Sequence, residues 1–190
     1  MNELHLVSDI PPSVNHYLAY RAVIRNGKPM AVSYSTKESV DYKKYFSDYV
    51  MHEVENQGWN LPVNKDQHFY VDGVFYFPRK NMDANNYWKI LLDAITDTQK
   101  IWADDNVVCE RVQGIFYDSN NPRIELEIKP VEYIGVFNNT SQLVEFKTNC
   151  VGCSRYTRNC SILQSAIDGR VQDEIKDNKC SVYRRSKDVD

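Results

Sequence analysis

An aromatic run that ends at a proline, followed by an amphipathic segment, most constrains how this chain can fold. Residues 68–77 are rich in aromatic and β-branched side chains and stop at Pro78, as a central strand does. In residues 86–98 the apolar positions recur at helical spacing and leave the polar side chains on the opposite face. We therefore expect a strand followed by a helix, with functional side chains on the polar face of that helix.

The remaining elements follow from turn and cap signals. The dipeptide Asn26-Gly27 tolerates positive φ and predicts a β-hairpin over residues 19–34. Ser35 with Glu38 three positions later predicts a capping box, which starts a helix of about five turns. Three further strands are expected, over residues 3–9, 107–117 and 122–129.

Length and charge bound the class of protein. A chain of 190 residues can hold one ordinary domain and a tail of a few dozen residues. A net charge of -3 argues against a broad basic face, so any DNA contact must be local, metal-assisted or shared across an oligomer. The chain shows no leader pattern and no apolar run of membrane length, which predicts no membrane segment and a cytoplasmic location.

Acidic side chains on both sides of the 86–98 helix suggest a magnesium site that handles phosphate. Asp83 precedes the helix, Lys89 lies in its first turns and Asp105 follows it, so folding the helix onto the sheet can bring them together. Simpler interpretations remain open: Asp83 as an N-cap, residues 104–106 as a polar turn, and Lys89 with Asp93 as a surface ion pair.

Three separated motifs carry a family resemblance. Residues 83–96 read DANNYWKILLDAIT, residues 101–107 read IWADDNV, and residues 11–17 read PPSVNHY. They resemble the RusA-type Holliday junction resolvases, whose signature is D-x-D-N-x-x-K-x-x-x-D-A-L, then D-D-x-x-V, after a P-P-S-x-N start. The resemblance covers about residues 4–130.

That resemblance implies a fold and an activity. It implies an α+β fold, with a small mixed or antiparallel sheet and two main helices, that forms a homodimer. It further implies an endonuclease, usually of phage or prophage origin, that uses Mg²⁺ to cut paired strands of four-way DNA junctions in recombination and repair. The setting would be a bacterial cell or a phage-infected host.

The resemblance also assigns roles residue by residue. Asp83 and Asp105 match two metal-binding aspartates of the family, and Lys89 matches its catalytic lysine. Asn85 stands where the family has its remaining catalytic aspartate, and an amide can lend magnesium one oxygen but no charge. Asp93 and Asp104 match acidic positions that are candidates for structural roles.

The departure at Asn85 leaves three explanations open. Another carboxylate substitutes for the missing aspartate, the protein binds branched DNA without cutting it, or the residue was replaced deliberately to prevent cleavage. A nuclease is the leading hypothesis, a non-catalytic branched-DNA binder is its alternative, and a third interpretation is an adaptor in phage replication or recombination.

A four-way junction has approximate two-fold symmetry, so a homodimer can place two active sites on opposing strands. Basic side chains of the hairpin and of the segment before the site are candidate phosphate contacts, each of which could equally be an ordinary solvated charge. These candidates are Arg21, Arg25, Lys28, Arg79 and Lys80.

The composition changes near the end of the chain, which predicts a RusA-like domain over residues 1–135 and an extension over residues 136–190. Four cysteines of the extension, Cys150, Cys153, Cys160 and Cys180, begin with the C-x2-C spacing of many structural zinc sites.

The ligands of such a metal site would all be thiolates. No histidine follows His68, so the sequence predicts a possible Zn²⁺ site, with an iron–sulfur cluster, disulfides and free thiols as alternatives. The fifth cysteine, Cys109, is expected to be a buried apolar residue of a strand. Arginines of the extension, Arg155, Arg158 and Arg170, are candidates for contacts with DNA or a partner.

Overall fold

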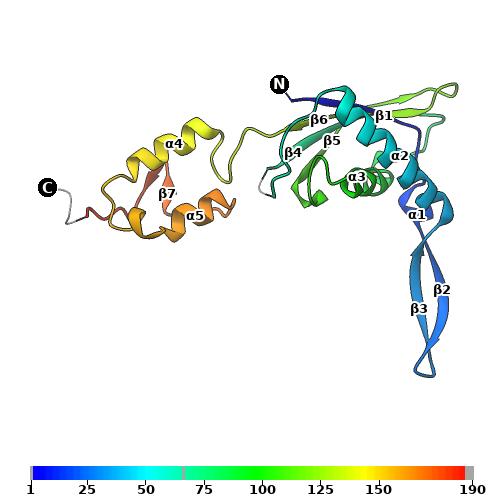
Figure 1. Ribbon diagram of the computed structural model, residues 1–190, viewed down its shortest axis with the longest axis horizontal. Helices are drawn as coiled ribbons and strands as arrows, with labels where there is room; N and C mark the ends of the chain where they lie inside the picture. Colours follow the sequence, from blue (N-terminus) through cyan, green and yellow to red (C-terminus); the bar gives the residue numbers. More distant parts are fainter. Residues whose placement is uncertain (1, 66, 187–190) are drawn as a thin grey trace. The chain divides into compact units, whose positions relative to one another are not determined.

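The computed structural model describes residues 2–65 and 67–186 and divides the chain into two compact units. Unit 1 is Met1–Pro130 and unit 2 is Val131–Asp190. Figure 1 shows the elements of both units. Within the described ranges, no helix has the length and apolar character needed to cross a membrane.

Unit 1 is built on a mixed four-stranded sheet with the order β1-β6-β4-β5. Central strand β4 pairs in parallel with β5 on one side and antiparallel with β6 on the other, and β6 also pairs antiparallel with β1. The bounds are β1 Leu4–Ser8, β4 Phe69–Phe77, β5 Val108–Tyr117 and β6 Arg123–Pro130. These strands confirm the central strand expected at 68–77 and the α+β fold class.

Helix α3, Trp88–Asp97, lies between β4 and β5 in sequence, because two parallel strands need a crossover connection. Its apolar side chains pack with alternate residues of β4 into one core. At Gly73 of β4 a Cβ atom would lie 2.6 Å from the Trp88 ring, so glycine permits this close approach. Helix α2, Lys37–Asn56, adds Phe46 and Val50 to the same core.

The two helix starts differ from the predicted ones. The N-cap of α2 is Thr36, whose hydroxyl accepts a hydrogen bond from the Ser39 N–H at 3.3 Å, and not Ser35, which ends a strand. Helix α3 begins two residues later than expected, because Ala84–Asn86 forms a separate 3₁₀ turn, η1.

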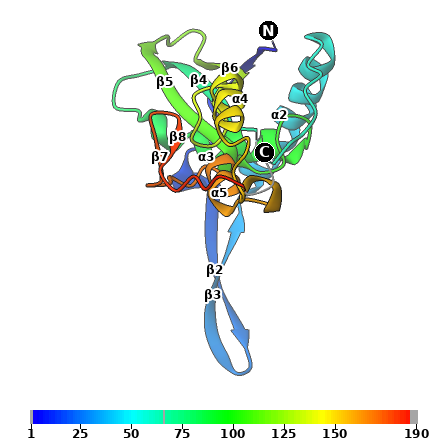
Figure 2. The same cartoon turned by 90° about the vertical axis from the view of Figure 1, so that its left-hand side faces the viewer.

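The predicted hairpin is confirmed, as strands β2 Leu18–Arg25 and β3 Lys28–Ser35. Asn26 and Gly27 have φ values of 52° and 73°, as a tight hairpin turn requires. A four-residue helix, α1 Val14–Tyr17, precedes the hairpin. Figures 1 and 2 show the hairpin projecting from the rest of unit 1, and most of its side chains are exposed.

Unit 2 is made of short elements around a small core. Its buried side chains include Phe137, Leu143, Phe146 and Ala166, together with Cys150. The elements are α4 Thr140–Asn149, η3 Tyr156–Arg158, α5 Ser161–Ile167, β7 Ile175–Lys176 and β8 Lys179–Cys180.

Candidate active site at the start of helix α3

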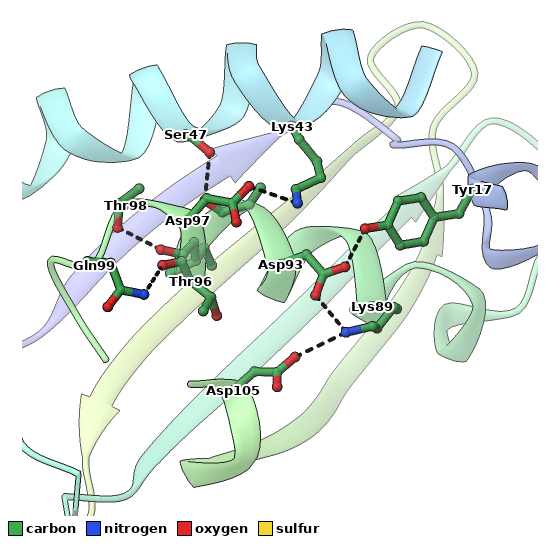
Figure 3. Close-up of polar contacts among 12 residues, drawn as sticks. Tyr17, Lys43, Ser47, Lys89, Asp93, Thr96, Asp97, Thr98, Gln99 and Asp105 are labelled. Atoms are coloured by element: carbon green, nitrogen blue, oxygen red, sulfur yellow. Dashed lines mark hydrogen bonds and ion pairs between the residues drawn. The ribbon is translucent and has the colours of Figure 1, made fainter. Parts of the chain in front are cut away.

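A lysine held between two aspartates forms the centre of the site (Figure 3). The Lys89 ammonium donates to Asp93 Oδ1 at 2.6 Å and lies 3.5 Å from Asp105 Oδ2. Lys89 and Asp93 are one helical turn apart on α3, and Asp105 begins the 3₁₀ turn η2, Asp105–Val107, that leads into β5. The expected Lys89–Asp93 ion pair is therefore present, and it is extended to Asp105.

Asp93 is occupied on both oxygens. Its Oδ2 accepts a hydrogen bond of 2.5 Å from the Tyr17 hydroxyl, which comes from the other end of unit 1 in sequence. Burial, then the bond to Asp93, raises the pKa of Tyr17, so the phenol stays protonated and remains a donor. Asp93 thus anchors Lys89, whereas Asp105 retains capacity for another partner.

The pKa of Lys89 is raised chiefly by its hydrogen bond to Asp93, against an opposing effect of burial. The negative charge of Asp105 adds to the same upward shift. Lys89 is therefore fully cationic at neutral pH, and its side chain is 56% exposed, so an incoming anion can reach it.

The simpler interpretation is also consistent with the structure: Asp83 is an N-cap, and the polar turn expected at residues 104–106 is present. Asp83 Oδ1 accepts a hydrogen bond of 3.0 Å from the Asn85 N–H and caps η1, and Asp104 Oδ1 accepts one of 3.0 Å from the Asn106 N–H and caps η2. The site contacts thus join Lys89 to Asp93 and Asp105, while those of Asp83 are made within η1. Asp83 and Asn85 are both exposed.

Glu110 is an acidic side chain near Asp105 that sequence reasoning did not consider. It lies on β5, five residues after Asp105, and partial desolvation followed by the charge of Asp105 raises the pKa of its carboxyl group. The charged form is therefore disfavoured first by partial desolvation and then by the nearby like charge. Lys89, Asp93, Asp105 and Glu110 are called the α3 cluster below, and it contains one cation and three carboxyl groups.

The donor set of the α3 cluster fits a magnesium ion in part. Within residues 2–65 and 67–186, no group of three or more His, Cys, Asp and Glu side chains could hold a metal ion. Magnesium is usually held by one or two carboxylates, with water and substrate phosphates completing its shell. Asp105 with the nearby Glu110 supplies oxygen donors of that kind and an excess of negative charge.

A second ionic cluster lies on β4, β5 and β6. Asp72 accepts two hydrogen bonds of 2.6 Å from Arg111 and one of 2.6 Å from Gln113, and Lys129 lies 3.3 Å away. Burial opposes ionisation of Asp72, but these donors outweigh it and lower the pKa of Asp72 to about 2. We call Asp72, Arg111, Gln113 and Lys129 the sheet-face cluster.

The predicted DNA contacts are all exposed, in both the hairpin and the segment after β4. Arg21 lies 5.6 Å above the Tyr34 ring across the hairpin, a cation–π distance. In unit 2, Arg155 and Arg158 line one cavity together with Arg184, and Arg170 lies outside its lining.

Comparison with known families decides the relationship. The family model described as endodeoxyribonuclease RusA matches residues 9–129. The chain belongs to the RusA family. The match covers more than half of the chain and contains every residue of the α3 cluster. A comparison with curated proteins gave no significant match.

RusA membership implies endonuclease activity on Holliday junctions in general, and nucleases of this family generally need a divalent metal ion. The matched segment ends one residue before the end of unit 1, so the whole of unit 2 lies outside the RusA match.

Proposed function

We propose that this protein is a Mg²⁺-dependent, structure-selective endodeoxyribonuclease that resolves four-way DNA junctions as a homodimer. The observation that carries the proposal is the placement of Lys89 between Asp93 and Asp105, all three within the RusA-matched segment. A fixed cation beside an incompletely paired carboxylate is what phosphodiester hydrolysis needs on the protein side.

Each member of the α3 cluster has a distinct task in this proposal. Tyr17 holds Asp93, and Asp93 holds Lys89, so the ammonium is positioned before DNA arrives. Lys89 stays protonated and stabilises the charge that develops on the scissile phosphate. Asp105 and Asp83 hold the metal ion, with Glu110 adding negative charge nearby. When bound, magnesium supplies Lewis-acid polarisation of the phosphate and an activated water.

Asn85 supports a second candidate function. Its amide is exposed on η1 and carries no charge, so the metal site lacks one carboxylate that the family pattern provides. A protein with this fold and weak metal affinity would bind branched DNA without cutting it. Glu110 supports the nuclease, because it lies close enough to Asp105 for their charges to interact and offers a further carboxyl group in place of the missing one.

Exposed basic side chains support the DNA contact. The projecting hairpin carries Arg21, Arg25 and Lys28, and Arg79 and Lys80 follow the end of β4. Charges on a projecting hairpin can reach a phosphate backbone that the sheet itself cannot approach. In a dimer this local basic surface would be doubled, which offsets the net negative charge of the chain.

Cleavage of a labelled synthetic four-way junction tests the proposal. With Mg²⁺ the chain should release paired nicked products, and Asp83→Asn and Asp105→Asn should each lower the rate by at least about 100-fold. Asn85→Asp should raise the rate, because it restores a charged ligand position. Asp104→Asn serves as the matched control, because Asp104 caps η2 one residue before Asp105.

Three outcomes discriminate between the two functions. Junction binding without cleavage in the chain, but with cleavage in Asn85→Asp, supports the non-catalytic binder. Equal cleavage rates for the chain and Asn85→Asp remove the ligand role of position 85. Cleavage that persists in EDTA would contradict the metal-dependent mechanism.

A further inference from the structure

Unit 2 brings four cysteines from separate elements to one place. Cys150 ends helix α4, Cys153 follows in the next turn, Cys160 precedes helix α5 and Cys180 ends strand β8. All four line one small cavity of about 10 Å³. Cys150 and Cys153 are buried, Cys160 and Cys180 are half-buried, and no disulfide joins these four cysteines.

Backbone hydrogen bonds fix the segment around Cys153. The Tyr156 N–H donates to the Cys153 carbonyl oxygen at 3.0 Å, and the Ser154 N–H donates to the Arg184 carbonyl oxygen at 2.8 Å. Strand-like pairing between Cys153 and Arg185 holds the two backbone segments together.

Two turns near the cysteines have backbone conformations with positive φ. Gly152, inside the C-x2-C segment, has a φ of 82°, and a Cβ atom there would lie 2.9 Å from the Tyr183 hydroxyl. Asp177 and Asn178 both have positive φ and form the hairpin turn that leads to Cys180. Both turns adopt backbone conformations that most residues avoid, and each adjoins a cysteine of the cavity.

Unit 2 otherwise has little to stabilise it. Its strands are two residues long, helix α5 has seven residues, and Cys150 is itself part of the small core. Units of this size with such a core are commonly completed by disulfides or by a structural metal ion. No disulfide joins the four cysteines, and their convergence on one cavity favours a metal ion.

We propose that unit 2 holds one structural Zn²⁺ ion through Cys150, Cys153, Cys160 and Cys180. Four thiolates that converge on one place are the ligand set of a single tetrahedral Zn²⁺ ion. Among the described residues the four thiols are not arranged as a formed metal centre, so the proposal requires side-chain rotations that bring the sulfurs together. This site is independent of the nuclease proposal, because it lies outside the RusA-matched segment.

Metal analysis of the full chain, expressed with zinc and iron both available, tests the proposal. We expect about one zinc per chain, falling to below about 0.2 in each Ser variant of the four cysteines, since three thiolates hold zinc far more weakly than four. Cys109→Ser is the matched control and should retain its zinc, because Cys109 lies on β5 of unit 1. The Co²⁺-substituted chain should show the absorption of tetrahedral thiolate ligands.

Thiol modification of the unmodified chain is a second measurement, which tests the proposal even if a Ser variant fails to fold. In the folded chain the four thiols of unit 2 should react slowly with a thiol reagent, and a strong chelator should make all four reactive without changing the reaction rate of half-buried Cys109. Absence of zinc from the unmodified chain would overturn the proposal, as would iron with acid-labile sulfide. Loss of zinc in Cys109→Ser would also overturn it.

Discussion

The two ionic clusters of unit 1 contain the same kinds of side chain but differ in charge balance. In the sheet-face cluster, Arg111, Gln113 and Lys129 all donate to or neutralise Asp72. In the α3 cluster, Lys89 pairs with Asp93 and Asp105, and Glu110 adds a third carboxyl group near Asp105. The first cluster is complete by itself, whereas the second carries excess negative charge that a divalent cation can neutralise.

The pKa shifts of the two clusters point in opposite directions. The pKa of Asp72 is lowered to about 2 by its donors despite burial, whereas the pKa of Glu110 is raised by burial and by Asp105. Ionised Asp72 therefore stabilises the fold, and ionised Glu110 is tolerated at a cost. The comparison indicates that charge balance separates the self-contained sheet-face cluster from the α3 cluster, to which we assign the proposed function.

The largest expected effect is the difference in junction-cleavage rate between Lys89→Met and Lys129→Met. Lys89→Met should lower junction cleavage by at least about 100-fold, because it removes the cation beside the phosphate. Lys129→Met removes a cation of the sheet-face cluster and should leave cleavage within about threefold. Single-turnover cleavage with saturating Mg²⁺ measures both, and similar losses in the two variants would refute the division of roles.

Asp72→Asn should lower the free energy of unfolding at pH 7 by about 2 kcal/mol, because it removes the acceptor that two cations share. The folded pKa of Asp72, about 2, lies below the ordinary 3.8, so its contribution is present above about pH 4 and is lost as the pH falls towards 2. The free energies of unfolding of the chain and of Asp72→Asn, measured in urea, should therefore converge as the pH falls from 7 to 2. A constant difference across that range would contradict the lowered pKa.

Glu110→Gln should produce the smallest change in the free energy of unfolding, and that change should be an increase, opposite to the decrease expected for Asp72→Asn. Without a divalent cation it should raise the free energy of unfolding by a few tenths of a kcal/mol, since it removes a carboxylate that the fold disfavours. It should also raise the Mg²⁺ concentration needed for half-maximal cleavage. Glu127→Gln is the control. Glu127 lies on β6, where it pairs with Asp72 of β4, and its replacement should leave that Mg²⁺ concentration unchanged.

Local sequence patterns predicted most of the fold. Apolar spacing predicted the helix at 86–98 and the strands at 107–117 and 122–129, composition predicted the central strand at 68–77, and Asn26-Gly27 predicted the hairpin. The structure confirms these elements. The helix starts were not predicted correctly, because Ser35 and Thr36 are both good caps and only strand pairing at Ser35 decides between them.

The candidate site was predicted in part. The motif predicts Lys89 and Asp105 as site residues, and the structure places their side chains together. In the sequence, Glu110 does not differ from other solvent-facing charged residues of a strand. No local pattern reveals Glu110, because its importance depends on proximity to Asp105. The sheet-face cluster was missed for a similar reason, since Asp72 and Arg111 are paired across strands that are far apart in sequence.

Anomalous scattering from Mn²⁺ used in place of Mg²⁺ in a crystal of this protein tests the central claim most directly. The account predicts a peak in contact with the carboxylate of Asp105 and shared with Asp83, beside the ammonium of Lys89, and its loss in Asp105→Asn. A peak that survives in Asp105→Asn, or one located only at the sheet-face cluster, would contradict the account.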